Sequence, residues 1–135
     1  MATELDAKFM IKTRITEMFG VETPICMGGM TGVGYAPLVA AAAEAGALAF
    51  LTAHMFNTAE GLEKEIAKVR SLTNKPFGVN LTILPSLNPI PYDEYRRVIC
   101  ETGIKIVETA GRNPVESERA HRVGPGRCEQ PGRRR

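Results

Sequence analysis

The sequence predicts an α/β fold with a parallel sheet, because short apolar segments alternate with segments of helical periodicity. Residues 24–27, 47–52, 77–83 and 104–108 are the four apolar segments. The stretches between them carry apolar residues every three or four positions, which is typical of helices packed on a sheet. Strands that alternate with helices in this way form βαβ units, in which consecutive strands run parallel. The pattern alone fits either the start of a doubly wound sheet or the start of a (β/α)₈ barrel.

The first elements are expected to be a helix, a strand and a second helix. Residues 8–19 have apolar side chains at helical spacing and are expected to cover the bottom of a sheet or barrel. A strand over 24–27 follows. The next helix begins near Pro37, since proline suits the first helical turn, and ends at Ala45, because Gly46 can adopt the left-handed conformation that stops a helix.

A buried strand over 47–52 is expected to lead into another helix. Asn57 and Glu60 have the spacing of a capping box at its start. Three apolar residues share one face of this helix and predict that it packs on a sheet: Leu62, Ile66 and Val69.

The remaining elements follow the same alternation. Residues 77–83 are expected to be the third strand, and the proline-rich residues 85–91 a loop at the rim. A helix over 92–102, stopped by Gly103, then leads into a fourth strand over 104–108.

A glycine-rich segment, residues 28–34, joins the first strand to the alanine-rich helix. Glycine lets a ligand approach the backbone closely and adopts positive φ angles without strain. The segment lacks the Gly-Lys-Ser/Thr of a P-loop and does not match G-x-G-x-x-G in register. From the residues alone, it is either a site for a flat or phosphorylated cofactor or a tight turn whose glycines avoid strain.

Several segments have distinctive sequences: Thr23-Pro24-Ile25, Met27-Gly28-Gly29-Met30, the alanine-rich 38–48, Lys75-Pro76-Phe77-Gly78-Val79-Asn80 and the largely apolar 103–111. Together they resemble the sequences of the nitronate monooxygenase family, whose members are FMN-dependent barrels once called 2-nitropropane dioxygenases. The resemblance extends from about Thr13 to Gly111. It implies that residues 1–111 are the first half of a (β/α)₈ barrel of about four parallel βα units with an N-terminal helix, since a complete barrel has about 250 residues.

In such a barrel, the active site lies at the carboxyl ends of the strands. The resemblance implies that five residues there bind FMN: Met27, Gly28, Gly29, Met30 and Asn80. The alternative for Asn80 is a structural amide that holds the neighbouring loop, and Glu108 is either a rim carboxylate or a structural one. The family's catalytic histidine lies beyond the fourth strand, so neither His54 nor His121 inherits that role. We assign no catalytic residue and expect no metal site.

The resemblance implies an oxidoreductase in which FMN oxidises an alkyl nitronate and passes electrons to O₂, giving a carbonyl compound and nitrite. The 135-residue chain is expected to be a truncated form with weak activity or none. Two alternatives stay open. One is an FMN-dependent enoyl-thioester reductase, which has a similar start to its barrel, and the other is a non-catalytic fragment.

Residues 112–135 differ from the rest of the chain. They contain seven arginines and three glutamates, 7 − 3 = +4, whereas the whole chain carries +2, and they have no Leu, Ile, Phe, Met, Tyr or Trp. They are expected to be a disordered basic tail or an out-of-frame reading of G·C-rich coding sequence. The second is favoured, because the resemblance stops in the middle of a domain.

Composition and location of the charges suggest few macromolecular partners. The tail has no aromatic residue to stack on bases, so no nucleic-acid partner is expected. The longest apolar stretch contains Glu44 and Gly46, which argues against a membrane span.

Three widely spaced cysteines, with no visible secretory leader, predict reduced thiols and a cytoplasmic protein: Cys26, Cys100 and Cys128. The open edges of a half-barrel predict self-association.

Overall fold

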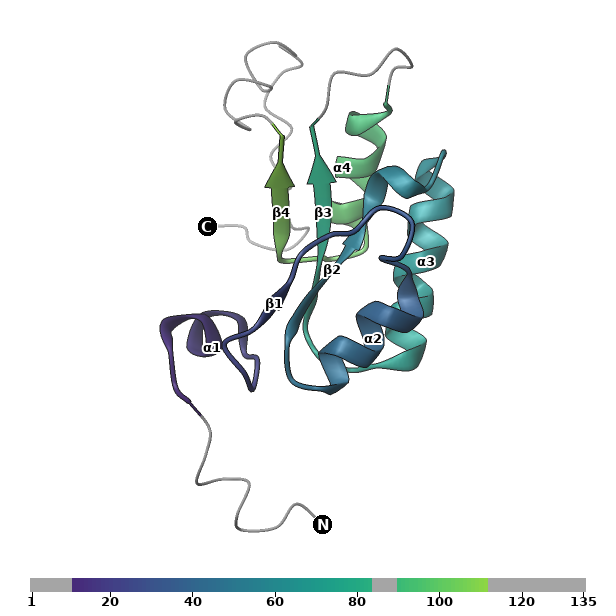
Figure 1. Ribbon diagram of the computed structural model, residues 1–135. Helices are drawn as coiled ribbons and strands as arrows, with labels where there is room; N and C mark the ends of the chain where they lie inside the picture. The colour runs from purple at the N-terminus through teal and green to yellow at the C-terminus, as the bar shows by residue number, and fades with distance from the viewer. Residues whose placement is uncertain (1–10, 84–89, 112–135) are drawn as a thin grey trace, which may run out of the picture.

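The computed structural model describes residues 11–83 and 90–111 of the chain. Its elements in chain order are α1 (Arg14–Phe19), β1 (Cys26–Met27), α2 (Ala36–Glu44), β2 (Leu48–Thr52), the 3₁₀ helix η2 (Ala53–Met55), α3 (Ala59–Leu72), β3 (Phe77–Thr82), α4 (Tyr92–Glu101) and β4 (Val107–Ala110). The strands form one parallel sheet in the order β1-β2-β3-β4 (Figure 1). This confirms the predicted α/β class with four parallel βα units.

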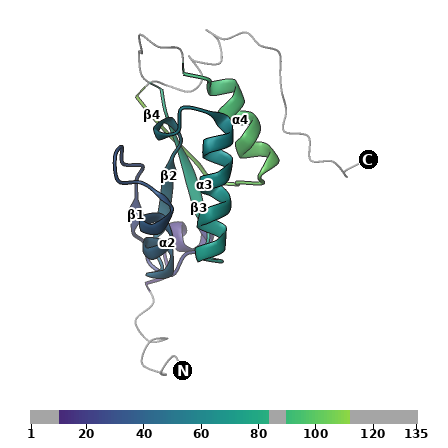
Figure 2. The ribbon, with the colours of Figure 1, turned by 90° about the vertical axis from the view of Figure 1, so that its right-hand side faces the viewer.

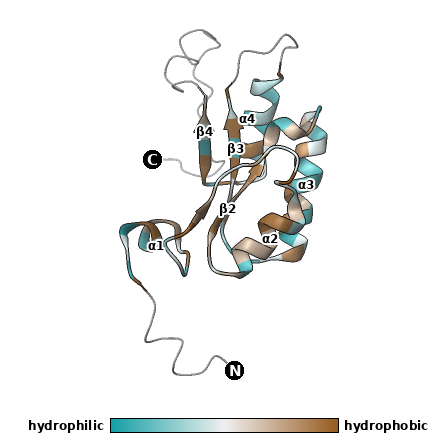
Figure 3. Ribbon diagram, in the orientation of Figure 1, coloured by the Kyte–Doolittle hydropathy of each residue, from teal (hydrophilic) through white to brown (hydrophobic). Residues whose placement is uncertain are grey.

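Helices α2, α3 and α4 lie side by side on one face of the sheet (Figure 2). The helix of each βα unit therefore covers the same face, as in one half of a (β/α)₈ barrel. The three apolar residues predicted on one face of α3 are all fully buried against the sheet: Leu62, Ile66 and Val69. Figure 3 shows the strands largely hydrophobic and the helices α3 and α4 with hydrophilic outer surfaces.

The two faces of the sheet are packed by alternate residues of each strand. On the helix side, Ala49 and Leu51 of β2 pack with Val79 of β3 in the main core. On the other side, Leu48 and Phe50 form a smaller cluster with neighbours that include residues near α1. This second face is the one that points into the interior of a barrel.

Helix α1 is shorter than predicted. The prediction of a helix over residues 8–19 is wrong for 11–13, and residues 8–10 lie outside the described part of the chain. Thr13 caps α1, because its hydroxyl accepts from the backbone N–H of Thr16 at 3.4 Å and the Thr16 hydroxyl accepts from the backbone N–H of Thr13 at 2.9 Å. Ile11, which the periodicity placed in the helix, lies outside it and is 65% exposed.

Other boundaries also differ from the prediction. Strand β1 covers Cys26–Met27 rather than 24–27. The N-cap of α3 is Thr58 rather than Asn57, and its hydroxyl accepts from Gly61 N at 3.1 Å. Strand β4 begins at Val107 rather than at 104, because the N–H of Ile104 still closes the end of α4 by donating to Ile99 O. The predicted left-handed stops are confirmed at Gly46 and Gly103, with φ angles of 84° and 68°.

Several expectations fall on residues that the structure does not describe. Residues 85–89 of the proline-rich segment lie outside the described part of the chain, as does the whole segment 112–135. The boundary at residue 111 and the nature of the tail therefore stay predictions. Over residues 11–83 and 90–111, no helix is long and apolar enough to cross a membrane. Cys26 is a free, exposed thiol, whereas Cys100 is disulfide-bonded, so the expectation of a reduced thiol is wrong at that residue.

Candidate functional site at the carboxyl edge of the sheet

The residues at the carboxyl ends of the strands meet at one edge of the sheet. Strand register pairs Thr52 of β2 with Asn80 of β3, and Asn80 with Glu108 of β4. Register places their Cα atoms side by side on neighbouring strands, on the face that carries the smaller apolar cluster at its other end. The glycine-rich segment 28–34 follows β1 and leads into α2 at this edge (Figure 1).

Glu108 joins the glycine-rich segment to β3. Its Oε2 atom accepts from the backbone N–H of Gly29 at 2.9 Å and from the side-chain amide Nδ2 of Asn80 at 2.8 Å. The Oδ1 atom of Asn80 in turn accepts from the Thr82 hydroxyl at 2.8 Å. Asn80 is only 2% exposed, and both of its polar side-chain atoms have partners, which explains how an amide is accommodated inside an apolar strand.

The glycines of this segment serve two different purposes. A Cβ on Gly29 would lie 2.4 Å from the Asn80 Cβ, and one on Gly34 would lie 2.8 Å from the Thr52 hydroxyl oxygen. Gly28 is less crowded, since its Cβ would lie 3.1 Å from the Glu108 Oε1 atom. Within the segment, a positive φ occurs only at Gly32, at 87°. Close packing therefore accounts for Gly29 and Gly34, and avoidance of strain for Gly32 alone.

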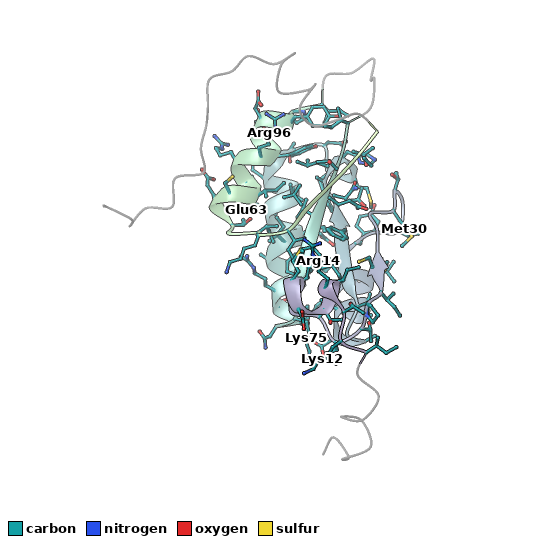
Figure 4. The ribbon with its side chains drawn as sticks, turned by 90° about the vertical axis from the view of Figure 1, so that its left-hand side faces the viewer. Lys12, Arg14, Met30, Glu63, Lys75 and Arg96 are labelled. Carbon is teal, nitrogen blue, oxygen red and sulfur yellow. The ribbon has the colours of Figure 1, made fainter. Side chains whose placement is uncertain are left out.

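The five residues assigned to a cofactor site are not all in the same environment. Gly28, Gly29 and Asn80 come together through Glu108. Met27 is half-buried and packs against the main core on the helix side of the sheet. Met30 is 39% exposed and lies on the opposite side of the molecule from Glu63 and Arg96 (Figure 4).

A second polar group lies at the end of β2 and includes His54, to which the resemblance gives no catalytic role. The Thr31 hydroxyl lies 3.0 Å from His54 Nε2, so the glycine-rich segment also contacts η2. The Nδ1 atom of His54 and the hydroxyl oxygen of Thr52 are buried and have no hydrogen-bond partner within the described part of the chain. Buried polar atoms of this kind are where a bound water or a polar ligand group is accommodated. The sequence offered one signal for the group of Thr31, Thr52 and His54, because all three residues follow or end the strands β1 and β2 at their carboxyl ends.

The amino end of α2 is already occupied by a side chain of the protein. The backbone N–H of Ala36 donates to Glu65 Oε1 of α3 at 2.8 Å. A helix N-terminus is a common binding site for phosphate, but here a carboxylate holds that position. The glycine-rich segment therefore lacks the phosphate-binding geometry of a glycine loop that opens a helix.

A cavity of about 680 Å³ lies at the other edge of the sheet, beneath the amino ends of β3 and β4. Its lining includes Phe19, Arg70 and Lys105. Lys75, at this lower end in Figure 4, forms an ion pair with Glu22 at 2.5 Å, and this hydrogen-bonded carboxylate raises the pKa of Lys75. Active sites of parallel barrels lie at the carboxyl edge, so we do not assign this cavity to the functional site.

Over residues 11–83 and 90–111, no three His, Cys, Asp or Glu side chains gather as metal ligands would.

Four parallel βα units with a polar cluster at their carboxyl edge define this protein as the first half of a (β/α)₈ barrel. The family model for nitronate monooxygenase matches residues 12–124. The chain therefore belongs to the nitronate monooxygenase family, as its sequence motifs predicted.

Sequence relatives of two kinds support this assignment. A protein of Staphylococcus aureus named "Probable nitronate monooxygenase" is 43% identical over 72 residues, which cover 53% of this chain and 20% of that protein. The (3aS,4S,5R,7aS)-5-hydroxy-7a-methyl-1-oxo-octahydro-1H-indene-4-carboxyl-CoA dehydrogenase of Mycobacterium tuberculosis is 42% identical over 71 residues, with the same two coverages. The match thus spans about one fifth of the length of these curated relatives.

Solved structures agree on the fold. FabK from Thermotoga maritima matches with a TM-score of 0.70 and 33% identity, over 82% of this chain and 34% of that one. A nitroalkane oxidase from Streptomyces ansochromogenes matches with a TM-score of 0.61 and 28% identity, over 72% and 36% of the two chains. The chain thus corresponds to about one third of each structure.

Proposed function

We propose that the carboxyl edge of the sheet binds the ring system of FMN, in an oxidoreductase that oxidises alkyl nitronates with O₂. The observation that carries the proposal is the junction of Gly29, Asn80 and Glu108, which fixes a side-chain-free stretch of backbone at this edge. Membership of the nitronate monooxygenase family supports the reaction class.

The residues present fit the ring of a flavin better than its phosphate. Gly28 and Gly29 offer backbone that a flat ring can approach, and the exposed Met30 adds apolar surface beside it. Among the described residues, no Lys or Arg side chain forms an ion pair with Glu108, and Glu65 holds the amino end of α2. We therefore assign the ring, and not the phosphate, to these residues.

When bound, FMN supplies the redox chemistry, taking electrons from the nitronate and passing them to O₂ with release of a carbonyl compound and nitrite. The described residues would orient the ring and exclude water beneath it. Asn80 would support the Gly29 backbone rather than bond to the ring itself, because its buried amide is already hydrogen-bonded to Glu108 and Thr82.

We also propose that the 135-residue chain turns over nitronates slowly or not at all. The described part of the chain contains a single histidine, His54, and its Nε2 atom is paired with the Thr31 hydroxyl. The resemblance to the family implies a catalytic histidine beyond the fourth strand, so we give His54 no catalytic role. The measurement is nitrite release from an alkyl nitronate with excess FMN, and steady turnover at about 1 s⁻¹ or faster would contradict the proposal.

The FMN proposal is tested by the Asn80→Ala variant. We expect weaker retention of FMN on dialysis and less quenching of flavin fluorescence, because the amide beneath Gly29 is lost. Asn74→Ala is the matched control, since Asn74 is exposed and lies at the opposite edge of the sheet. Equal retention in the parent and in Asn80→Ala would remove Asn80 from the site.

A second candidate is FMN-dependent oxidoreduction of a thioester, such as reduction of an enoyl thioester with NADH. The supporting observation is the name of the Mycobacterium tuberculosis relative, a carboxyl-CoA dehydrogenase, at 42% identity. Nitrite release from a nitronate and NADH-dependent loss of an enoyl thioester distinguish the two reactions. A chain that binds no flavin would favour the third candidate, a non-catalytic fragment.

A further inference from the structure

Glu108 occupies a position between three parts of the molecule. It lies on β4, and its Oε2 atom receives one hydrogen bond from the segment after β1 and one from β3. Among the described residues, it forms no ion pair with Lys or Arg. Its charge is therefore compensated by two neutral N–H donors, and such charge-assisted hydrogen bonds are about twice as strong as neutral ones.

We propose that Glu108 is a positioning residue for the flavin site, which fixes the Gly29 backbone and the Asn80 amide in one geometry. This inference rests on the proposed binding of FMN at this edge. Glu108 would not contact the cofactor itself. Its effect would pass through the Gly29 backbone, against which the ring would lie. We assign it no part in the chemical step.

The sheet would stay intact without these two bonds, whereas the backbone at Gly29 would lose its hydrogen bond to β4. Asn80 and Glu108 are already neighbours in the β3–β4 ladder, so strand pairing holds them together. The backbone at Gly29 has no such ladder, because β1 ends at Met27. Loss of the Glu108 carboxylate should thus loosen the backbone at Gly29 and leave the fold in place.

The orientation of Asn80 is fixed from both sides. The Thr82 hydroxyl donates to Oδ1, which leaves Nδ2 to donate to Glu108. An aspartate in place of Asn80 would face the Glu108 carboxylate without a proton to donate. Two carboxylates at this distance raise the pKa of one of them, so the pair would regain a hydrogen bond at low pH.

The experiment compares Glu108→Ala with Asn80→Asp. Glu108→Ala removes the one atom, Oε2, that accepts both hydrogen bonds, whereas a glutamine oxygen could still accept both. Glu101→Ala is the matched control, since Glu101 is an exposed carboxylate on α4 that pairs only loosely with Arg97 at 3.9 Å. Circular dichroism confirms that each variant is folded.

Two readouts are taken on the 135-residue chain. The first is amide hydrogen exchange at Gly29 without FMN, and the second is the FMN dissociation constant from fluorescence quenching at pH 8 and pH 5. We expect Glu108→Ala to speed Gly29 exchange and to weaken FMN binding, each about 10-fold. Asn80→Asp should bind FMN more weakly than the parent at pH 8 and recover at pH 5. Glu101→Ala should match the parent at both pH values.

The outcomes separate this inference from the proposed function. If the parent binds FMN and Glu108→Ala leaves both readouts unchanged, Glu108 is not a positioning residue and the FMN site stands. If the parent binds no FMN, the proposed function fails, and unchanged Gly29 exchange in Glu108→Ala overturns the junction as well. If Glu108→Ala does not fold, Asn80→Asp decides by its pH dependence, and binding that is equally weak at pH 5 and pH 8 contradicts the inference.

Discussion

Gly29 lies so close to Asn80 that a methyl group on Gly29 would stand 2.4 Å from the Asn80 Cβ and 2.5 Å from its Cγ. The neighbour is a buried side chain whose two polar atoms are both hydrogen-bonded, and it cannot move aside without breaking one of those bonds. The backbone of the glycine-rich segment therefore rests directly on a side chain of β3.

This contact predicts a large effect for Gly29→Ala. The added methyl group should lower the free energy of unfolding by about 1–3 kcal/mol, the usual effect of overpacking a well-filled site. Urea denaturation provides the measurement. Gly28→Ala is the matched control, because its methyl group meets only the end of the Glu108 side chain, at 3.1 Å, and should change stability by less than about 1 kcal/mol. Equal effects of the two substitutions would show that the segment is not packed on Asn80.

The buried hydroxyl of Thr52 predicts an unusual result for Thr52→Val. Since this hydroxyl has no partner within the described residues, its removal should leave the free energy of unfolding unchanged or raise it by up to about 1 kcal/mol.

Thr73→Val is the comparison for Thr52→Val. Thr73 is also buried, but its hydroxyl donates to Glu44 Oε1 and accepts from the backbone N–H of Lys75 at 3.0 Å. That substitution should lower stability by about 1–2 kcal/mol. A similar loss in Thr52→Val would mean that a water or ligand group satisfies the Thr52 hydroxyl.

Tyr95 predicts a change in stability at alkaline pH. Its hydroxyl donates to the backbone carbonyl of Phe56, and burial raises the pKa of Tyr95 above 10.0. The unfolded chain releases this proton more readily than the folded one, so the contribution of Tyr95 is fully present below pH 10 and is lost as the pH rises further. Tyr95→Phe should lower stability by about 1 kcal/mol at neutral pH and remove this part of the alkaline loss.

Thermal melting from pH 8 to pH 11 measures the effect of Tyr95. The control is Tyr35→Phe, because Tyr35 is 42% exposed and contacts Phe56 through its ring rather than its hydroxyl. If the parent and Tyr95→Phe lose stability in parallel above pH 10, the Tyr95 hydroxyl is not responsible.

Much of the fold was predictable because its signals are local. The helix face of Leu62, Ile66 and Val69 depends on spacing within one segment, and the helix ends at Gly46 and Gly103 depend on single residues that tolerate positive φ. The start of β4 was not predictable in this way. Residues 104–106, Ile-Lys-Ile, alternate as a strand does, but the first of them completes the hydrogen bonding of α4.

The candidate site was predictable in its location and not in its contacts. Parallel strands place the ends of β1 and β3 at one edge, which predicted that Gly28, Gly29 and Asn80 lie close together. The role of Glu108 depends on which of its neighbours its side chain reaches, and a single sequence carries no signal for a hydrogen bond between residues 79 positions apart. Met27 was placed at the site by its neighbours in sequence, although the alternation of β1 turns it toward the helices.

The bond between Gly29 and Glu108 has a consequence for the order of folding. The strand pairs β1–β2, β2–β3 and β3–β4 each join neighbours in the chain, so they can form one after another as the polypeptide leaves the ribosome. The bond at Gly29 closes a loop of 79 residues and must wait for β4, the last strand of the sheet. Pulsed hydrogen exchange during refolding should therefore protect the amides of β2 and β3 before that of Gly29, and in a nascent chain that stops before Glu108 the glycine-rich segment would still lack its bond to β4.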